Sequence, residues 1–162
     1  MIKSIPENDR YNIDHFLISH WGSEEMYIHT GRYNLRTLSG FYIEIEGEVV
    51  AALTYHLHDD CLEIISIDST KENEGHGTAL LTKAEQHAVD KGRDQVQLIT
   101  TNDNLNAIQF YLKRHYRLVC VKLDAVKEAR KCKPSIPLVN ENGLLVQDEL
   151  LFSKKLQLSV LR

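Results

Sequence analysis

Apolar and polar residues recur with two different periods along the chain, and the change of period separates the expected helices from the strands. Apolar side chains lie at helical spacing in residues 10–20, where we expect a helix with Asp9 as its N-cap. A short strand is expected before it, at residues 2–5. Residues 22–40 follow neither period, and "MYIHTGRYN" within them fits a strand or a broken helix.

The period then shortens to two. Residues 41–46, 49–58 and 62–68 alternate between apolar and polar, and Gly47 with Glu48 predicts a tight turn between the first two segments. We therefore expect three antiparallel strands joined as a meander.

The remainder of the chain alternates between helical and extended patterns. Helices are expected at residues 78–91, 105–115 and 124–133, and strands at residues 95–100, 116–123 and 148–158. The expected fold class is α+β, with a mixed, mostly antiparallel central sheet, helices on both faces and a single domain over residues 1–162.

Charge and composition exclude several functional classes. The 162 residues carry a formal net charge of -4, without the basic stripe typical of nucleic-acid binding. No apolar run approaches the roughly 20 residues that span a bilayer. "MIKSIPENDR" lacks the apolar segment of a signal peptide, and three cysteines without ligand-like spacing fit a reducing compartment. We expect a cytoplasmic protein with no nucleic-acid or membrane partner.

One glycine-bearing loop, "STKENEGHGTALL", joins an expected strand to an expected helix. Such a loop exposes the first unpaired amides of the helix, which together with the helix dipole favour an anion. Gly75 and Gly77 let the backbone approach a ligand closely. The spacing matches neither a dinucleotide fingerprint nor a P-loop, so the loop alone is also compatible with an ordinary turn. His76 within it is expected to be solvated.

A second motif, "NLNAIQFY", opens the helix expected at residues 105–115. Asn104 is its expected N-cap, and Ala107 and Tyr111 follow on the same side at spacings of three and four. The small alanine leaves room for a ligand against the helix, and a tyrosine hydroxyl can donate a proton.

Together and in this order, the two motifs resemble the GNAT superfamily of acetyl-CoA-dependent N-acetyltransferases. "ENEGHGTALL" is similar to the family's Arg/Gln-x-x-Gly-x-Gly/Ala loop, and "NLNAIQFYLKRHY" to its Asn-x-x-Ala-x-x-Phe-Tyr helix. "HWGS", "ITTNDN", "EARKCKPSIPL" and "QDEL" extend the resemblance to most of the chain. Two positions depart from it: Glu72 replaces Arg or Gln, which is expected to weaken coenzyme binding, and His115 replaces a glycine, which histidine tolerates comparatively well.

The resemblance implies direct transfer of acetyl from acetyl-CoA to an amine, without a metal or a covalent enzyme intermediate. It places the coenzyme in a cleft near Asp68 and Gln97, with Tyr111 as general acid for the leaving thiolate. Glu63 or Asp68 is the implied general base; each also has a structural alternative, an exposed strand residue for Glu63 and a turn former for Asp68. The implied cofactor-binding residues are Ile67, Asp68, Ser69, Glu74, Gly75, His76, Gly77, Thr78, Ala79, Asn104, Ala107 and Tyr111.

Other features leave alternatives open. His56 and His58 suit metal ligands or a polar strand face, and the face is favoured because no second ligand cluster accompanies them. A basic run around Arg130 suits a solvated helix face or a phosphate contact. Core packing is favoured over an acceptor pocket for the aromatic residues Trp21, Tyr27, Tyr33 and Phe41.

The expected partner is a small-molecule or peptide amine acceptor, and a homodimer through the last strand is possible. The alternative function is a non-catalytic acyl-CoA-binding or sensor module on the same fold. A purely structural domain is the third interpretation.

Overall fold

The computed structural model describes residues 1–71 and 74–157, which form two compact units. The first unit contains residues 1–26, 33–96 and the chain from residue 155, and the second contains residues 27–32 and 97–154. Glu72 lies outside the described residues, so its expected effect on coenzyme binding stays a prediction.

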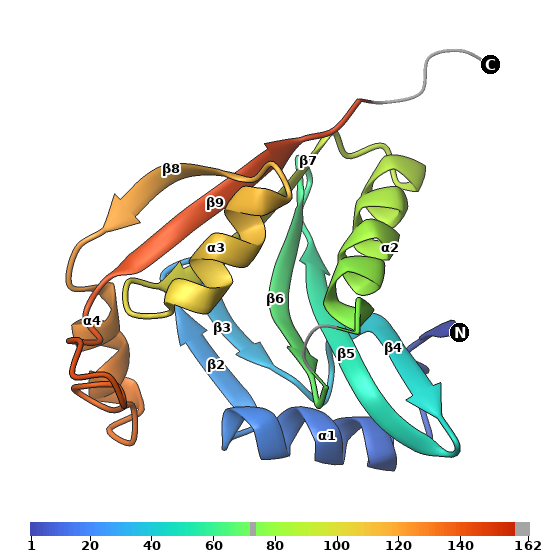
Figure 1. Cartoon of the computed structure of the whole chain (residues 1–162), viewed down its shortest axis with the longest axis horizontal. Coiled ribbons are helices and arrows are strands. Elements are labelled where there is room, and N and C mark those ends of the chain that lie inside the picture. Colours follow the sequence, from blue (N-terminus) through green and yellow to red (C-terminus); the bar gives the residue numbers. More distant parts are fainter. Residues whose placement is uncertain (72–73, 158–162) are drawn as a thin grey trace. The chain divides into compact units, whose positions relative to one another are not determined.

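The elements are, in chain order, β1 (Ile2–Ser4), α1 (Tyr11–Trp21), β2 (Glu25–Ile28), β3 (Gly31–Asn34), β4 (Ser39–Ile45), β5 (Glu48–Leu57), β6 (Leu62–Ser69), α2 (His76–Asp90), β7 (Gln95–Thr101), α3 (Leu105–Lys113), β8 (Arg117–Lys122), α4 (Ala125–Cys132) and β9 (Glu149–Lys155) (Figure 1). None of the helices within the described ranges is long and apolar enough to cross a membrane.

The sheet of the first unit runs in the order β1-β4-β5-β6, with antiparallel pairing throughout. The predicted meander is therefore confirmed. Its first turn lies one residue earlier than predicted, because Glu46 and Gly47 hold the positive φ angles of 52° and 82° that a tight hairpin turn requires, and Glu48 already begins β5.

Helices α1 and α2 cover opposite faces of this sheet. On one face, Phe41 and Tyr55 lie with ring centroids 5.7 Å apart and both contact the ring of His87 in α2. On the other face, Trp21 of α1 donates a hydrogen bond to Asp68 of β6. Since alternate residues of a strand point to opposite faces, the pairing register separates the two helices. The expected placement of helices on both faces is confirmed for this sheet.

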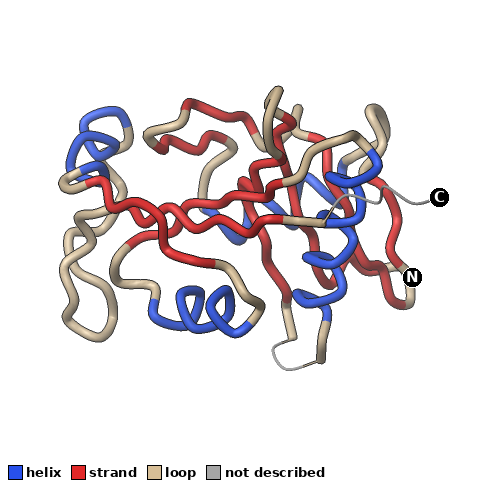
Figure 2. Tube along the Cα trace, turned by 90° about the horizontal axis from the view of Figure 1, so that it is seen from above, coloured by secondary structure: helices blue, strands red, loops and turns tan. Residues whose placement is uncertain are grey.

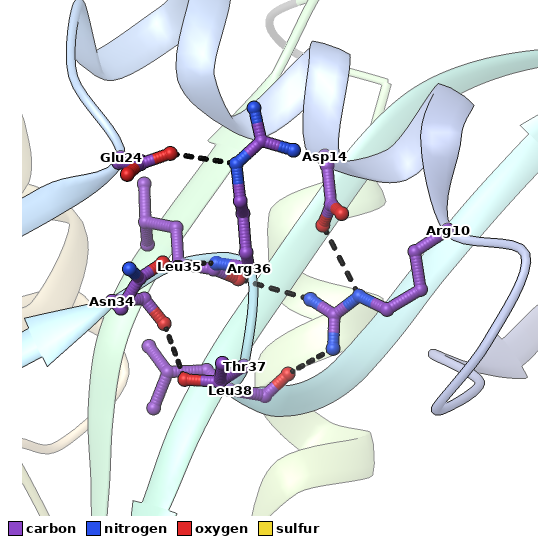
Figure 3. Close-up of polar contacts among 8 residues, drawn as sticks. All are labelled: Arg10, Asp14, Glu24, Asn34, Leu35, Arg36, Thr37 and Leu38. Carbon is purple, nitrogen blue, oxygen red and sulfur yellow. Dashed lines mark hydrogen bonds and ion pairs between the residues drawn. The ribbon is translucent and has the colours of Figure 1, made fainter.

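The start of α1 differs from the prediction. Asp9 has a φ of 59° and lies before the N-cap, which is Arg10. The guanidinium of Arg10 donates to the carbonyls of Leu35 and Leu38, at 2.9 Å each, and to the carboxylate of Asp14 at 3.1 Å (Figure 3). A long-range arginine, rather than a local acidic cap, thus fixes where α1 begins.

The segment that followed neither period is extended. Helix α1 ends at Gly22, which has a φ of 73°, and β2 and β3 then form a two-stranded sheet. The strand interpretation of "MYIHTGRYN" is confirmed.

The second unit holds the strand order β7-β9-β8, with β8 antiparallel to β9. Helix α3 lies on one side of these strands (Figure 2). It contacts them through Tyr111 and Phe152, whose ring centroids are 6.3 Å apart. Strand β9 has a neighbour on each side, so the last strand is not the open edge that we expected. That edge is β8, every residue of which is exposed.

Candidate functional site

The loop before α2 presents backbone donors as the glycine pattern predicts. Gly75 has a φ of 81° and is the N-cap, and the first helical bond of α2 runs from the Ala79 amide to the Gly75 carbonyl at 3.0 Å. The amides of His76, Gly77 and Thr78 precede that bond and point along the helix axis toward its N-terminal end. Three amides at the positive end of a fifteen-residue helix suit a phosphate group.

His76 is packed rather than solvated, which corrects our expectation. Its side chain is only 14% exposed, with Nε2 lying 3.9 Å from the carboxylate of the exposed Glu74. Its Nδ1 is buried and has no hydrogen-bond partner among the described residues. The ring therefore forms part of the loop's framework beside the three amides.

Strand β6 leads into this loop and is interrupted near its middle. Ile64 pairs with Tyr55 and Ser66 pairs with Thr54, so Ile65 is left out of the register as a bulge. Bulges are common beside active sites, where they redirect backbone groups. No glycine or proline marks this one in the sequence, so the alternating pattern gave no sign of it.

The end of β6 carries three of the predicted cofactor residues. Ile67, Asp68 and Ser69 are all half-buried, and the Ser69 hydroxyl donates to the Lys71 carbonyl at 2.9 Å. They lie in the first unit together with Glu74 and the four residues that follow Gly75.

Glu63 is fully buried on β6, which excludes the interpretation of an exposed strand residue. Its Oε1 lies 2.8 Å from Nε2 of His58, whose side chain is 30% exposed. Arg93 fixes the backbone of that histidine by donating from Nε to the His58 carbonyl at 2.9 Å. The sequence contained a usable signal, because a hairpin register that pairs His56 with Glu63 places both histidines and the glutamate on one face.

Asp68 lies on the same face of β6 but has a different partner. Trp21 donates from its indole nitrogen to Asp68 Oδ2 at 2.6 Å. Burial raises the pKa of Asp68, and the Trp21 hydrogen bond offsets part of that rise. Trp21 is 38% exposed, so the expectation of core packing is wrong for it, and its indole serves as a hydrogen-bond donor to Asp68. Phe41 is buried in the core as expected.

The cysteines offer no activated nucleophile. Cys61 is buried, and burial raises the pKa of its thiol to about 12, with Asp60 adding to the rise. A thiol in that state is almost entirely protonated near neutral pH and attacks poorly. No cluster of metal-ligating side chains is found in the described ranges, which include His56 and His58.

The predicted residues of the second unit lie on and beside α3. Asn104 is the N-cap, its Oδ1 accepting from the Ala107 amide at 3.2 Å as expected. Tyr111 is 5% exposed and lies in an aromatic cluster with Tyr116 and Phe152. Gln97 also belongs to this unit.

His115 adopts the left-handed conformation that its position in the resemblance requires. Its φ is 71°, and the Tyr116 amide next to it donates to the Tyr111 carbonyl at 3.0 Å. The substitution of histidine for glycine is therefore accommodated, as expected.

A polar cavity of about 420 Å³ opens beside the N-cap of α3, a feature that the sequence analysis missed. Asn104, Pro137 and residues 139–142 line it, and across one wall Asn140 donates to the carboxylate of Asp103 at 3.2 Å. The basic run of α4 helps to fix this wall, since Arg130 donates to the carbonyls of residues 136, 137 and 146. Arg130 therefore stabilises the backbone of this wall through hydrogen bonds and does not belong to a solvated helix face.

A second histidine–carboxylate pair, also missed, lies in the second unit. Glu149 of β9 is 2% exposed, and its Oε1 accepts from the backbone amide of His29 at 2.9 Å and faces His29 Nδ1 at 2.6 Å. The two residues are 120 positions apart, so no local pattern indicates their contact.

Comparison with known proteins gives concordant results. The profile of the Acetyltransferase (GNAT) family matches residues 8–116. Two uncharacterized proteins of Bacillus subtilis (strain 168) are similar to this chain. YdhI is 45% identical over 157 residues, which cover 95% of this chain and 98% of YdhI. YxbD is 47% identical over 143 residues, which cover 88% of this chain and 90% of YxbD. A GNAT family acetyltransferase from Elizabethkingia anophelis, solved with acetyl-CoA bound, superposes with a TM-score of 0.70 at 17% identity, covering 96% of this chain and 97% of that chain.

Proposed function

Because the chain belongs to the GNAT family of acetyltransferases, we propose that it transfers an acetyl group from acetyl-CoA to the amine of a small-molecule or peptide acceptor. The amine attacks the thioester carbonyl directly in a ternary complex. The new C–N bond forms, the C–S bond breaks, and CoA leaves with its thiol protonated. Holding amine and thioester together in this way accounts for much of the acceleration.

The observation that carries this proposal is the backbone geometry at the N-terminus of α2. Left-handed Gly75 begins the helix so that the amides of His76 and Gly77 lie at its N-terminal end, where they hold the pyrophosphate of the coenzyme. Binding here uses main-chain donors, so it needs no arginine or lysine in the loop.

In the first unit, the backbone of residues 67–69 pairs with the pantetheine arm of the coenzyme. Tyr111 donates the proton that the departing thiolate takes up. Its place in a packed aromatic cluster supports this role, because a clustered ring holds its hydroxyl in one position.

Direct attack is favoured over a covalent intermediate by the state of the cysteines. The raised pKa of Cys61 keeps its thiol protonated, and the other two cysteines are exposed, on β8 and at the end of α4. An acetylated cysteine would require a thiolate close to the coenzyme.

The experiment that tests the function is a screen of amines for acetyl-CoA-dependent release of CoA thiol. Polyamines, amino sugars, peptide N-termini and lysine side chains form the panel, and a thermal shift with CoA, compared with ATP, reports coenzyme binding. CoA release with at least one amine supports the proposal. Stabilisation by CoA without transfer to any amine favours the sensor module, and no stabilisation overturns both.

A further inference from the structure

The reaction needs a group that takes a proton from the amine, and the two carboxylates predicted for that role differ in how a proton can leave them. Glu63 is 0% exposed and contacts His58, whose ring is 30% exposed. Asp68 contacts an indole, which donates a hydrogen bond but does not titrate. His20 also lies near enough to Asp68 to lower its pKa, but the hydrogen bond described for Asp68 comes from Trp21. The hydrogen bond described for Glu63 joins it to a side chain that can accept a proton and reaches solvent.

The geometry of the pair determines which nitrogen of His58 is available. The 2.8 Å contact between His58 Nε2 and Glu63 Oε1 holds a proton on Nε2 when Glu63 is a carboxylate. The second ring nitrogen, Nδ1, then carries the lone pair. A buried carboxylate in this position orients the imidazole and stabilises the imidazolium that forms when Nδ1 is protonated.

The position of the pair in the fold points to the same role. Glu63 precedes the Ile65 bulge by two residues, on the strand whose end carries residues 67–69 of the proposed coenzyme site. Arg93 holds the His58 backbone from outside the hairpin, so both members of the pair are fixed.

We propose that His58 is the proton acceptor of the acetyl transfer and that Glu63 is the positioning residue that sets its tautomer, an inference that rests on the proposed function. As the amine nitrogen bonds to the acetyl carbon, one N–H proton passes to His58 Nδ1, directly or through one water. The C–S electron pair goes to sulfur, which takes a proton from Tyr111. His58 then loses its proton to solvent and Tyr111 regains one, so the net products are the amide and CoA thiol.

Several other charged or titratable groups lie near the imidazole of His58. On β5, His56 contacts His58 with ring centroids 4.6 Å apart, and Tyr33 of β3 contacts His56. The turn that follows His58 carries Asp59, Asp60 and Cys61, and Arg93 lies against the His58 carbonyl. Among these described groups, Glu63 is the one with a hydrogen bond to the His58 ring.

The test is the pH profile of kcat/KM in His58→Gln, with an amine found in the screen. Glutamine keeps a hydrogen-bond donor for Glu63 but does not titrate. The matched control is His29→Gln, which alters a histidine–carboxylate pair of the same kind in the second unit. Stabilisation by CoA is measured for both variants, so that a failure of coenzyme binding is distinguished from a failure of proton transfer.

His58→Gln is expected to lower kcat/KM about 10²-fold, a typical contribution of general base catalysis, and to remove the fall in rate on the acidic side of the profile. Stabilisation by CoA is retained. His29→Gln keeps the acidic fall. A wild-type rate and profile in His58→Gln overturns the assignment, as does loss of the acidic fall in His29→Gln alone. Failure of the wild-type protein in the amine screen is a different result, which rejects the proposed function itself.

Discussion

Glu63 and Asp68 are carboxylates on one face of the same strand, five residues apart, yet their surroundings give them different chemistry. Glu63 is completely buried and bonds to a titratable imidazole. Asp68 is half-buried and bonds to the indole nitrogen of Trp21. From the sequence both are equal candidates for a general base.

The difference shows that depth of burial does not by itself identify a base. A carboxylate buried this deeply can act through a titratable partner that reaches solvent, and Glu63 has such a partner in His58. Trp21 instead holds Asp68 as an acceptor and ties the end of α1 to the end of β6. We therefore assign proton transfer to the first site and positioning of the strand end to the second.

The largest effect is expected from Glu63→Gln. Without the carboxylate the imidazolium of His58 loses its stabilising charge and its tautomer is no longer fixed, so kcat/KM should fall by about 10²-fold, as in His58→Gln. Steady-state assays check this, with Glu149→Gln as the control for loss of a buried carboxylate that also bonds to a histidine. Equal losses of kcat/KM in Glu63→Gln and Glu149→Gln would contradict a specific role for Glu63 in proton transfer.

Tyr111→Phe should have the next largest effect, a loss of about 10 to 10³ in turnover, because the departing thiolate loses its proton donor. The aromatic cluster keeps its packing, since phenylalanine preserves the ring. Turnover and stabilisation by CoA are measured together across the pH range. The acidic fall assigned to His58 should persist, which separates the acid from the base; unchanged turnover would exclude Tyr111 as the donor.

Asp68→Asn should lower kcat/KM by less than about tenfold, because general bases typically contribute more than that. Its effect on stability has the opposite sign. Burial raises the pKa of Asp68, so the folded state binds its proton more tightly than the unfolded state. Ionisation of Asp68 therefore lowers stability as the pH rises above the ordinary value of 3.8, and the loss is complete above the raised pKa.

The amide of Asp68→Asn stays neutral, so it does not lose stability by ionisation. The melting temperature of Asp68→Asn should therefore exceed that of the wild type at pH 7, and the difference should narrow as the pH falls toward the ordinary value of 3.8. Thermal melts over this range check the sign. A loss of activity as large as that of Glu63→Gln would make Asp68 the base instead.

Trp21→Phe is expected to have the smallest effect. It removes the N–H donor, so the pKa of Asp68 should rise further. The lost hydrogen bond should cost about 1 kcal/mol of the free energy of unfolding, since the indole is partly exposed. Denaturant unfolding and NMR titration of the Asp68 carboxyl carbon measure the two quantities. A lowered Asp68 pKa would contradict the role given to the indole.

Much of the fold follows from local pattern. The period of two fixes the meander, the helical period fixes α2 and α3, and the polar residue before α3 fixes its cap at Asn104. Where a distant group replaces a local signal the prediction was wrong: Arg10 takes the place expected for Asp9 because it reaches carbonyls more than 20 residues away.

In the candidate site, too, features set by local sequence could be predicted better than contacts between distant residues. The glycine loop could be predicted because its function resides in the backbone, which Gly75 controls directly. The partners of the carboxylates could be predicted less well, because they depend on which strands lie side by side. The contact between His58 and Glu63 spans one hairpin, so it could have been predicted from the strand register. The contact between His29 and Glu149 joins residues 120 positions apart, so no local pattern predicts it.

The most direct measurement of the central claim is the tautomer of the neutral His58 ring, read from ¹⁵N shifts of histidine-labelled protein, with His58→Gln used for assignment. The account predicts that Nε2 carries the proton and donates it to Glu63, and that this preference is lost in Glu63→Gln. A neutral ring with its proton on Nδ1 would mean that Glu63 donates to Nε2 as a protonated acid. His58 would then have no lone pair for the amine proton, and the proposed route would be contradicted.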